Sequence, residues 1–238
     1  MARWEKTQLE NSANWQILDP IEATWGGGSN HPEELADHSV IVLGHPSHIG
    51  DMYAIGDCDL NGVTGLRLEA LTYGQLPFGG PGRSIDAGTF AISEMFVQVK
   101  EPNSTEWVKV PLQNATSDFS SPDSLLSTVP MANLPPEDQR KVGPVSYLID
   151  GNTGTAWHSD RGPGRRNTKS VAVIQFKEPL IFPAGTQIKV YFQQHHTRNT
   201  DPELGREAMM IIGRYRLALT RSPDPRAPSY NHHVTLAL

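Results

Sequence analysis

The chain has 238 residues, a formal net charge of −6 and 37% hydrophobic residues, which is enough apolar material for a globular core. The acidic balance excludes a sequence-wide attraction to nucleic acid or acidic membranes, and no apolar run approaches the length of a membrane helix. The 21 glycines and 19 prolines recur along the whole chain and argue against long helices. We therefore expect a single all-β domain over residues 1–238.

Short stretches of period-two alternation, each bounded by turn residues, predict about nine strands. The segments 63–71 and 214–220 place apolar residues on one face and mainly charged residues on the other, which is typical of half-buried antiparallel strands. Strands without intervening helices predict two packed sheets. The further predicted strands are 39–43, 52–55, 90–99, 107–112, 171–176, 187–192 and 233–238.

Three segments depart from this strand pattern. Residues 1–35 are interpreted as an N-terminal extension that packs on the sandwich. Residues 120–145 hold five prolines among polar residues and predict a long surface excursion, and residues 195–209 predict a second long loop rich in charge. Loops of this length on a compact sandwich are common places for binding residues.

A glycine-containing turn brings Asp150, Asn152 and Thr155 within six residues of one another. Such a turn can aim side-chain and backbone oxygens at one point, which is the arrangement that calcium requires. The alternative is that these side chains hydrogen-bond the local backbone in an Asx-type turn. The sequence leaves both interpretations open.

Glu94 is the further candidate metal ligand, because it shares strand parity with Phe90, Ile92 and Phe96, which we expect to face the core. A buried carboxylate needs a partner. That partner is either a calcium ion near the Asp150 turn, or an arginine or backbone amide.

The segment 148–157, Leu-Ile-Asp-Gly-Asn-Thr-Gly-Thr-Ala-Trp, resembles the signature of discoidin-like and coagulation-factor-type C-terminal domains. Together with 64–71, 76–83, 90–97, 118–120 and 213–217, it resembles the discoidin-like region of the planctomycete multidomain cytochrome c family, over roughly residues 35–221. The resemblance implies a galactose-binding-like jelly-roll β-sandwich of two antiparallel sheets, structural calcium, and a core position for Trp157. It also implies a binding part of a larger exported bacterial protein, in the periplasm or outside the cell.

The segment 161–169, which follows this signature, holds three arginines and a lysine without an acid. Arginine forks could grip the carboxylates or sulfates of an acidic glycan, whereas the alternative is a solvated loop that balances an acidic protein. Trp25 beside three glycines is either an exposed aromatic platform or an anchor for the N-terminal segment. The predicted ligand-binding residues are Arg161, Arg165, Arg166, His158, Arg83 and Trp25.

The sequence does not predict redox or transition-metal chemistry in this chain. The lone Cys58 excludes a haem attachment motif, so any haem belongs to other domains. The histidine pairs 45/48, 195/196 and 232/233 lack the ligand spacing of a zinc centre. The N-terminal ten residues also lack the apolar core of a signal peptide.

We predict non-catalytic recognition of a carbohydrate or extracellular polymer. The chain has no nucleophile elbow, no phosphate-binding glycine loop and no His-Glu-x-x-His helix. A second hypothesis is a structural domain that docks onto neighbouring, haem-bearing domains without a free ligand. A third is a glycan-active enzyme such as a lyase or esterase, because carboxylate dyads can assemble from residues far apart in sequence.

Overall fold

The computed structural model describes residues 15–25, 30–44, 50–126, 140–201 and 206–228. Within them the chain is all-β, as predicted, with two short 3-10 helices, η1 (Pro77–Gly79) and η4 (Val145–Ile149). In the part of the chain so described, no helix has the length and apolarity needed to cross a membrane.

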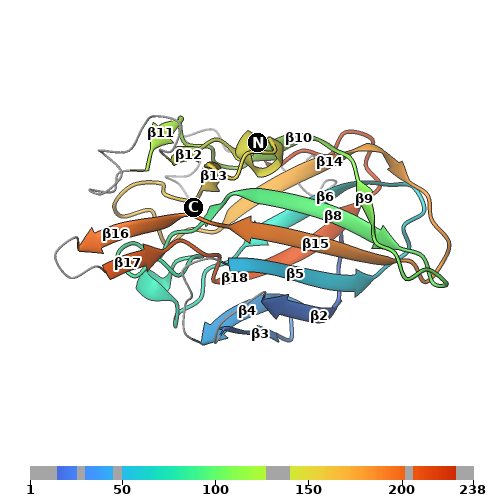
Figure 1. Ribbon diagram of the computed structural model, residues 1–238, viewed down its shortest axis with the longest axis horizontal. Coiled ribbons are helices and arrows are strands. Elements are labelled where there is room, and N and C mark those ends of the chain that lie inside the picture. Colours follow the sequence, from blue (N-terminus) through green and yellow to red (C-terminus); the bar gives the residue numbers. More distant parts are fainter. Residues whose placement is uncertain (1–14, 26–29, 45–49, 127–139, 202–205, 229–238) are drawn as a thin grey trace, which may run out of the picture.

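Two antiparallel sheets stack face to face and form the body of the molecule (Figure 1). The first sheet runs in the order β10-β14-β6-β18-β4-β3, with β1 also paired to β18. The second runs in the order β2-β5-β15-β8-β9. The first comprises β1 (Trp15–Ile17), β3 (Asn30–Glu34), β4 (Val40–Gly44), β6 (Val63–Ala70), β10 (Leu112–Ser117), β14 (Ser170–Leu180) and β18 (Arg214–Thr220). The second comprises β2 (Pro20–Trp25), β5 (Gly50–Asp57), β8 (Glu94–Lys100), β9 (Val108–Val110) and β15 (Gln187–Gln194).

The core lies between the two sheets, because alternate residues of each strand point inward. Strand β15 alternates strictly between partly and fully buried residues, and its Phe192 packs edge-on against Tyr215 of β18 at 5.2 Å between ring centroids. Trp157 is 0% exposed and packs edge-on against Phe90 at 5.1 Å, so its predicted core position is confirmed. Burying side chains of this size contributes about 1.5–3 kcal/mol each.

A small third sheet covers one end of the sandwich and presents the turn around Asp150. Its order is β11-β12-β13-β7, and its β12–β13 pair is parallel. Helix η4 leads directly into Asp150, and β13 starts at Thr155, so the turn is held at both ends. The strands are β7 (Ala91–Ile92), β11 (Ser124–Leu125), β12 (Lys141–Gly143) and β13 (Thr155–His158).

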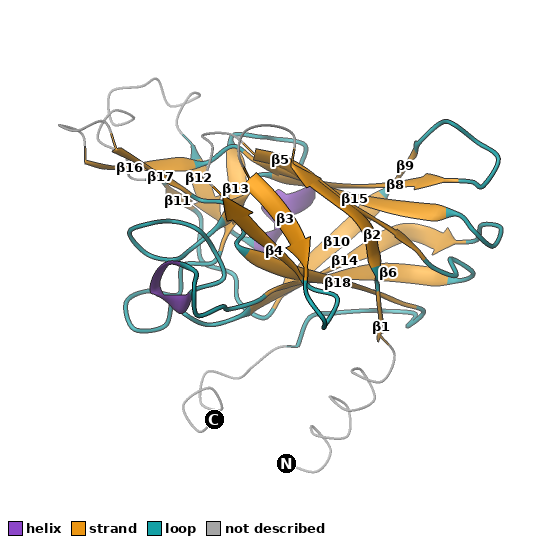
Figure 2. Cartoon of the chain, turned by 90° about the horizontal axis from the view of Figure 1, so that it is seen from below, coloured by secondary structure: helices purple, strands orange, loops and turns teal. Residues whose placement is uncertain are grey.

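The segment 15–34 is part of the two sheets and not only an extension that packs on them. It supplies β1, β2 and β3, and Figure 2 shows β2 and β3 beside β4. Prolines at positions 20 and 32 obscured these strands in the sequence. Because β2 and β3 lie at sheet edges, they tolerate a residue that cannot donate to a ladder.

Several predicted boundaries are corrected. The predicted strand 90–99 is interrupted at Ser93, so Phe96 faces outward, whereas Met95 and Val97 are buried. The predicted strand 107–112 splits at Pro111 into β9 and β10, which belong to different sheets.

The predicted loop 195–209 is also corrected, because it contains the hairpin of β16 (Thr197–Asp201) and β17 (Arg206–Met209). The middle of the proline-rich excursion, 127–139, and the predicted strand 233–238 lie outside the described residues. The ends of the excursion form β11 and β12.

Candidate functional site

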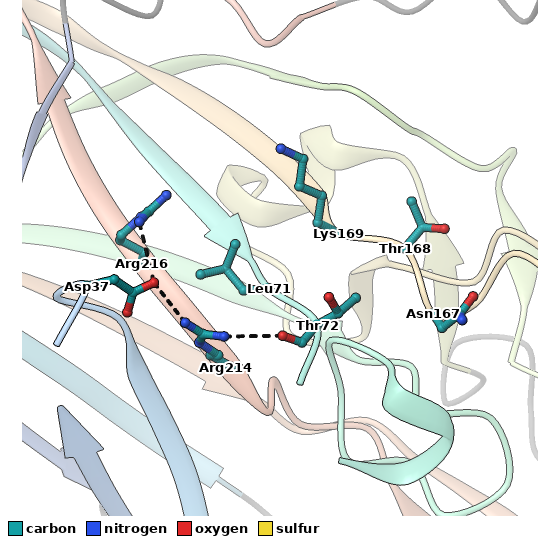
Figure 3. Close-up of a pocket in the computed structure, with 8 residues that line it drawn as sticks. All are labelled: Asp37, Leu71, Thr72, Asn167, Thr168, Lys169, Arg214 and Arg216. Carbon is teal, nitrogen blue, oxygen red and sulfur yellow. Dashed lines mark hydrogen bonds and ion pairs between the residues drawn. The ribbon is translucent and has the colours of Figure 1, made fainter. Parts of the chain in front are cut away.

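A polar groove opens on the outer face of the first sheet, where β6 ends and β14 and β18 begin. Figure 3 shows two arginines of β18 on one side of it and the segment 167–169 on the other. We call this feature the arginine groove. It is an open groove with a volume of about 430 Å³, and it is lined by Asp37, Leu71, Thr72, Asn167, Thr168, Lys169, Arg214 and Arg216.

The alternation of β18 creates the arginine side of the groove. Because Tyr215 and Leu217 point into the core, the neighbouring Arg214 and Arg216 must point outward. Arg214 donates through Nη2 to Asp37 Oδ2 at 2.7 Å and through Nε to Ser39 Oγ at 2.8 Å. The turn before β4 therefore fixes this guanidinium.

Arg216 is fixed in the same way by the strand beside it. It lies opposite Glu69 of β6 and donates through Nε to Glu69 Oε2 at 2.8 Å, while its Nη1 lies 3.5 Å from Asp37 Oδ2. Burial alone would raise the pKa of Asp37, but hydrogen bonds from Ser39 and the charge of Arg214 hold that pKa below its usual value. Asp37 is thus a stable anionic link between the two arginines.

The electrostatic balance of the groove is positive. Arg214, Arg216 and Lys169 contribute three cations, against Asp37 in the lining and Glu69, which is paired with Arg216. The Lys169 side chain is exposed at the edge of the groove. The remaining lining groups are mainly hydroxyls and an amide, so the groove offers charge together with hydrogen-bonding groups.

In the predicted basic loop two arginines are paired with acids from outside the segment 161–169, as Arg214 and Arg216 are paired in the groove. Arg161 donates to Asp118 Oδ2 at 2.7 Å in an ion pair whose side chains are 12% and 4% exposed. Arg166 grips both oxygens of Asp160, at 2.8 and 3.0 Å. The loop lacks acids of its own, but acids before it in the chain occupy two of its arginines, and Arg165 remains exposed.

The other predicted ligand residues are not among the described residues that line the groove. His158 is buried in β13. Arg83 donates to the carbonyl oxygens of Leu43 and Gly44 at the end of β4. Trp25 ends β2, and its side chain lies outside the described residues. The sequence analysis did not name Arg214 and Arg216 as ligand residues. The outward Arg-x-Arg pattern of β18 could have indicated them.

The predicted metal residues do converge, at the turn beside η4. Glu94 is 2% exposed, and its Oε1 accepts the N–H groups of Gly151 at 2.7 Å and Asn152 at 3.0 Å. Asp150 accepts the Asn152 N–H at 2.9 Å through Oδ1 and the Thr155 hydroxyl at 2.8 Å through Oδ2. The Asx-type hydrogen bonds are therefore present, and Glu94 has backbone amide partners.

Two carboxyl groups, those of Glu94 and Asp150, interact at this turn. Burial and the neighbouring Asp150 carboxyl together raise the pKa of Glu94 to about 7, against the opposing effect of the two amides. Either a proton or a divalent cation would relieve the repulsion between them. An all-oxygen donor set fits calcium, with Glu94 and Asp150 as the charged ligands and with Asn152 and Thr155 holding the turn.

The sequence matches no family model and no curated protein sequence. A solved structure of a mutant family 29 carbohydrate-binding module is similar over 90% of this chain and 86% of its own, at 7% identity and a TM-score of 0.29. A TM-score this low does not establish a common fold.

Replacing Arg161 with alanine should destabilise the fold. An arginine in a merely solvated loop could be replaced with little change in stability. The change leaves Asp118 buried without its cation, and breaking a buried ion pair typically lowers the free energy of unfolding by about 3–5 kcal/mol. Urea denaturation measures this. Arg165→Ala is the matched control from the same loop and should stay within about 0.5 kcal/mol of wild type. Equal stability of both variants would contradict the structural role of Arg161.

Replacing Glu94 with glutamine should remove a pH dependence of stability. The folded chain holds the Glu94 proton up to a pKa of about 7, against a usual value of 4.5, so wild-type stability should fall as pH rises between these values. Glutamine stays neutral and keeps an acceptor for the two amides. Urea unfolding in chelator from pH 4 to 8 should give a wild-type-minus-variant difference that declines by no more than about 3 kcal/mol. A constant difference would show that Glu94 titrates normally.

Proposed function

We propose that the chain is a non-catalytic module that binds an acidic polysaccharide in the arginine groove. The observation that carries the proposal is the groove itself, in which Arg214, Arg216 and Lys169 surround a space of about 430 Å³. That volume lies within the range of small-molecule sites, roughly 300–1,000 Å³. One or a few sugar rings of a longer chain would occupy it.

The chemistry of the lining favours a polyhydroxylated anion. Guanidinium and ammonium groups bind carboxylates and sulfates through charge-assisted hydrogen bonds, which are about twice as strong as neutral ones. Thr72, Thr168 and Asn167 can exchange hydrogen bonds with sugar hydroxyls. The molecule carries a net charge of −6, so a positive groove on it concentrates binding of an anion at one place.

The arginines of the groove are held in place, and this favours ligand binding more than mobile arginines on a solvated surface would. Because Asp37 and Glu69 already hold Arg214 and Arg216 in place, a ligand need not immobilise two long side chains. Less conformational entropy is then lost on association. Lys169 completes the groove from the opposite side and is the more adaptable cation.

We further propose that calcium binds at Glu94 and Asp150, where it would stabilise the end of the sandwich. The support is the paired carboxyl groups at the turn and the resemblance of that turn to discoidin-like domains. The same resemblance supports a place in a larger exported protein, in the periplasm or outside the cell.

Added calcium should stabilise the folded wild-type protein, because it binds the folded chain, and it should not stabilise Glu94→Gln.

Lys169→Ala should weaken polysaccharide binding by about tenfold without changing the melting temperature. The side chain is exposed, so its loss leaves the fold intact, while one charge-assisted contact is removed. Affinity electrophoresis in polygalacturonate measures the change, with hydroxyethyl cellulose as the neutral polymer. Wild-type binding should also weaken as salt rises, because screening shortens the range of charge interactions to about 10 Å at 0.1 M.

Arg165→Ala is the control, because it removes a cation from the same loop outside the groove lining. It should bind polygalacturonate like wild type. Equal losses in the two variants would mean that general charge drives the binding. No retention of wild type by either polymer would contradict recognition of acidic polysaccharide and favour a docking role.

A further inference from the structure

A second cluster of chemically active side chains lies at the turn that carries Asp37. The turn joins β3 to β4 and is closed by hydrogen bonds from Leu35 N–H to Ser39 O at 2.7 Å and from His38 N–H to Leu35 O at 2.8 Å. His38 adopts a left-handed φ of 58°. Asp19, just before β2, reaches the same place from the second sheet.

Three ligand atoms meet at this cluster. His38 Nδ1 lies 3.0 Å from Asp19 Oδ1 and 3.0 Å from Glu34 Oε1. All three atoms lie within 4.8 Å of one another. One ring nitrogen therefore faces two carboxylates that come from separate parts of the chain.

We propose that Asp19, Glu34 and His38 form a zinc site. An imidazole nitrogen with two carboxylate oxygens is a donor set that zinc accepts, and bonds of about 2.0–2.1 Å in tetrahedral geometry place ligand atoms about 3.3 Å apart. The two nitrogen–oxygen separations of 3.0 Å lie close to that spacing. Two carboxylates and a divalent cation also give a neutral site.

The exposure of the cluster fits an open metal site. The side chains of His38, Asp19 and Glu34 are 47%, 65% and 41% exposed, so the ion can enter and water can supply the remaining coordination position. The imidazole distinguishes this site from the all-oxygen turn at Asp150, because nitrogen ligands favour zinc over calcium. The two proposed metal sites therefore differ in their donor atoms and share no residue.

Zinc at this position would link the two sheets at their edges. Asp19 enters the edge strand of the second sheet, whereas Glu34 and His38 flank the edge of the first, and β2 lies beside β3 and β4 in Figures 1 and 2. The ion would also hold the turn whose Asp37 fixes Arg214. The proposal does not depend on what the arginine groove binds.

Isothermal titration of chelator-treated full chain with zinc chloride tests the site. We expect the wild-type protein to bind one equivalent that His38→Gly loses. Glycine is the substitution of choice because it accepts the left-handed backbone at this position without strain, so folding is preserved. Asp19→Asn and Glu34→Gln should each weaken that equivalent by at least about tenfold, since each removes a charged ligand.

His195→Ala is the matched control. His195 Nε2 lies 2.9 Å from Asp51 Oδ1, so it is a histidine paired with a carboxylate outside the proposed site. This variant should keep the equivalent that His38→Gly loses. If His38→Gly loses the equivalent and His195→Ala keeps it, the zinc is bound at His38 and not by histidines outside the described residues. If His38→Gly binds as much zinc as wild type at the same affinity, the site does not exist.

Discussion

The outward guanidinium groups of β18 are the constraint on which both the fold and the groove depend. The strand must bury Tyr215 and Leu217 to close the core, which forces Arg214 and Arg216 onto the opposite face. Like charges two residues apart would repel there without counter-ions. Glu69 from β6 and Asp37 from the turn before β4 supply them, so one set of ion pairs joins neighbouring parts of the first sheet and shapes the groove.

Much of the sandwich could be predicted because alternation is a local property of the sequence. Strands such as β6, β15 and β18 carry it clearly, and the buried Trp157 follows from the resemblance around Asp150. Edge strands were missed because their pairing depends on neighbours distant in the chain and because they contain prolines. The hairpin of β16 and β17 was missed for a related reason, since a polar segment gives no apolar alternation to detect.

The site was harder to predict than the fold, because residues far apart in sequence decide how each charged side chain is paired and held. Asp118 precedes Arg161 by 43 residues and neutralises it. The groove combines residues from the turn before β4, the end of β6, the segment before β14 and β18 itself. Glu94 was the exception: its burial required a partner, and the structure supplies one at the predicted turn even though the expected position of Phe96 was wrong.

Chemical-shift mapping of isotope-labelled protein during titration with an oligogalacturonate tests the binding account most directly. The account predicts saturable shifts at the amides of 167–169, of Asp37 and of Arg214 to Arg216, with the amides of the Asp150 turn unchanged. Saturable shifts confined to another surface, or no shifts at millimolar ligand, would contradict the assignment of the arginine groove as the binding site.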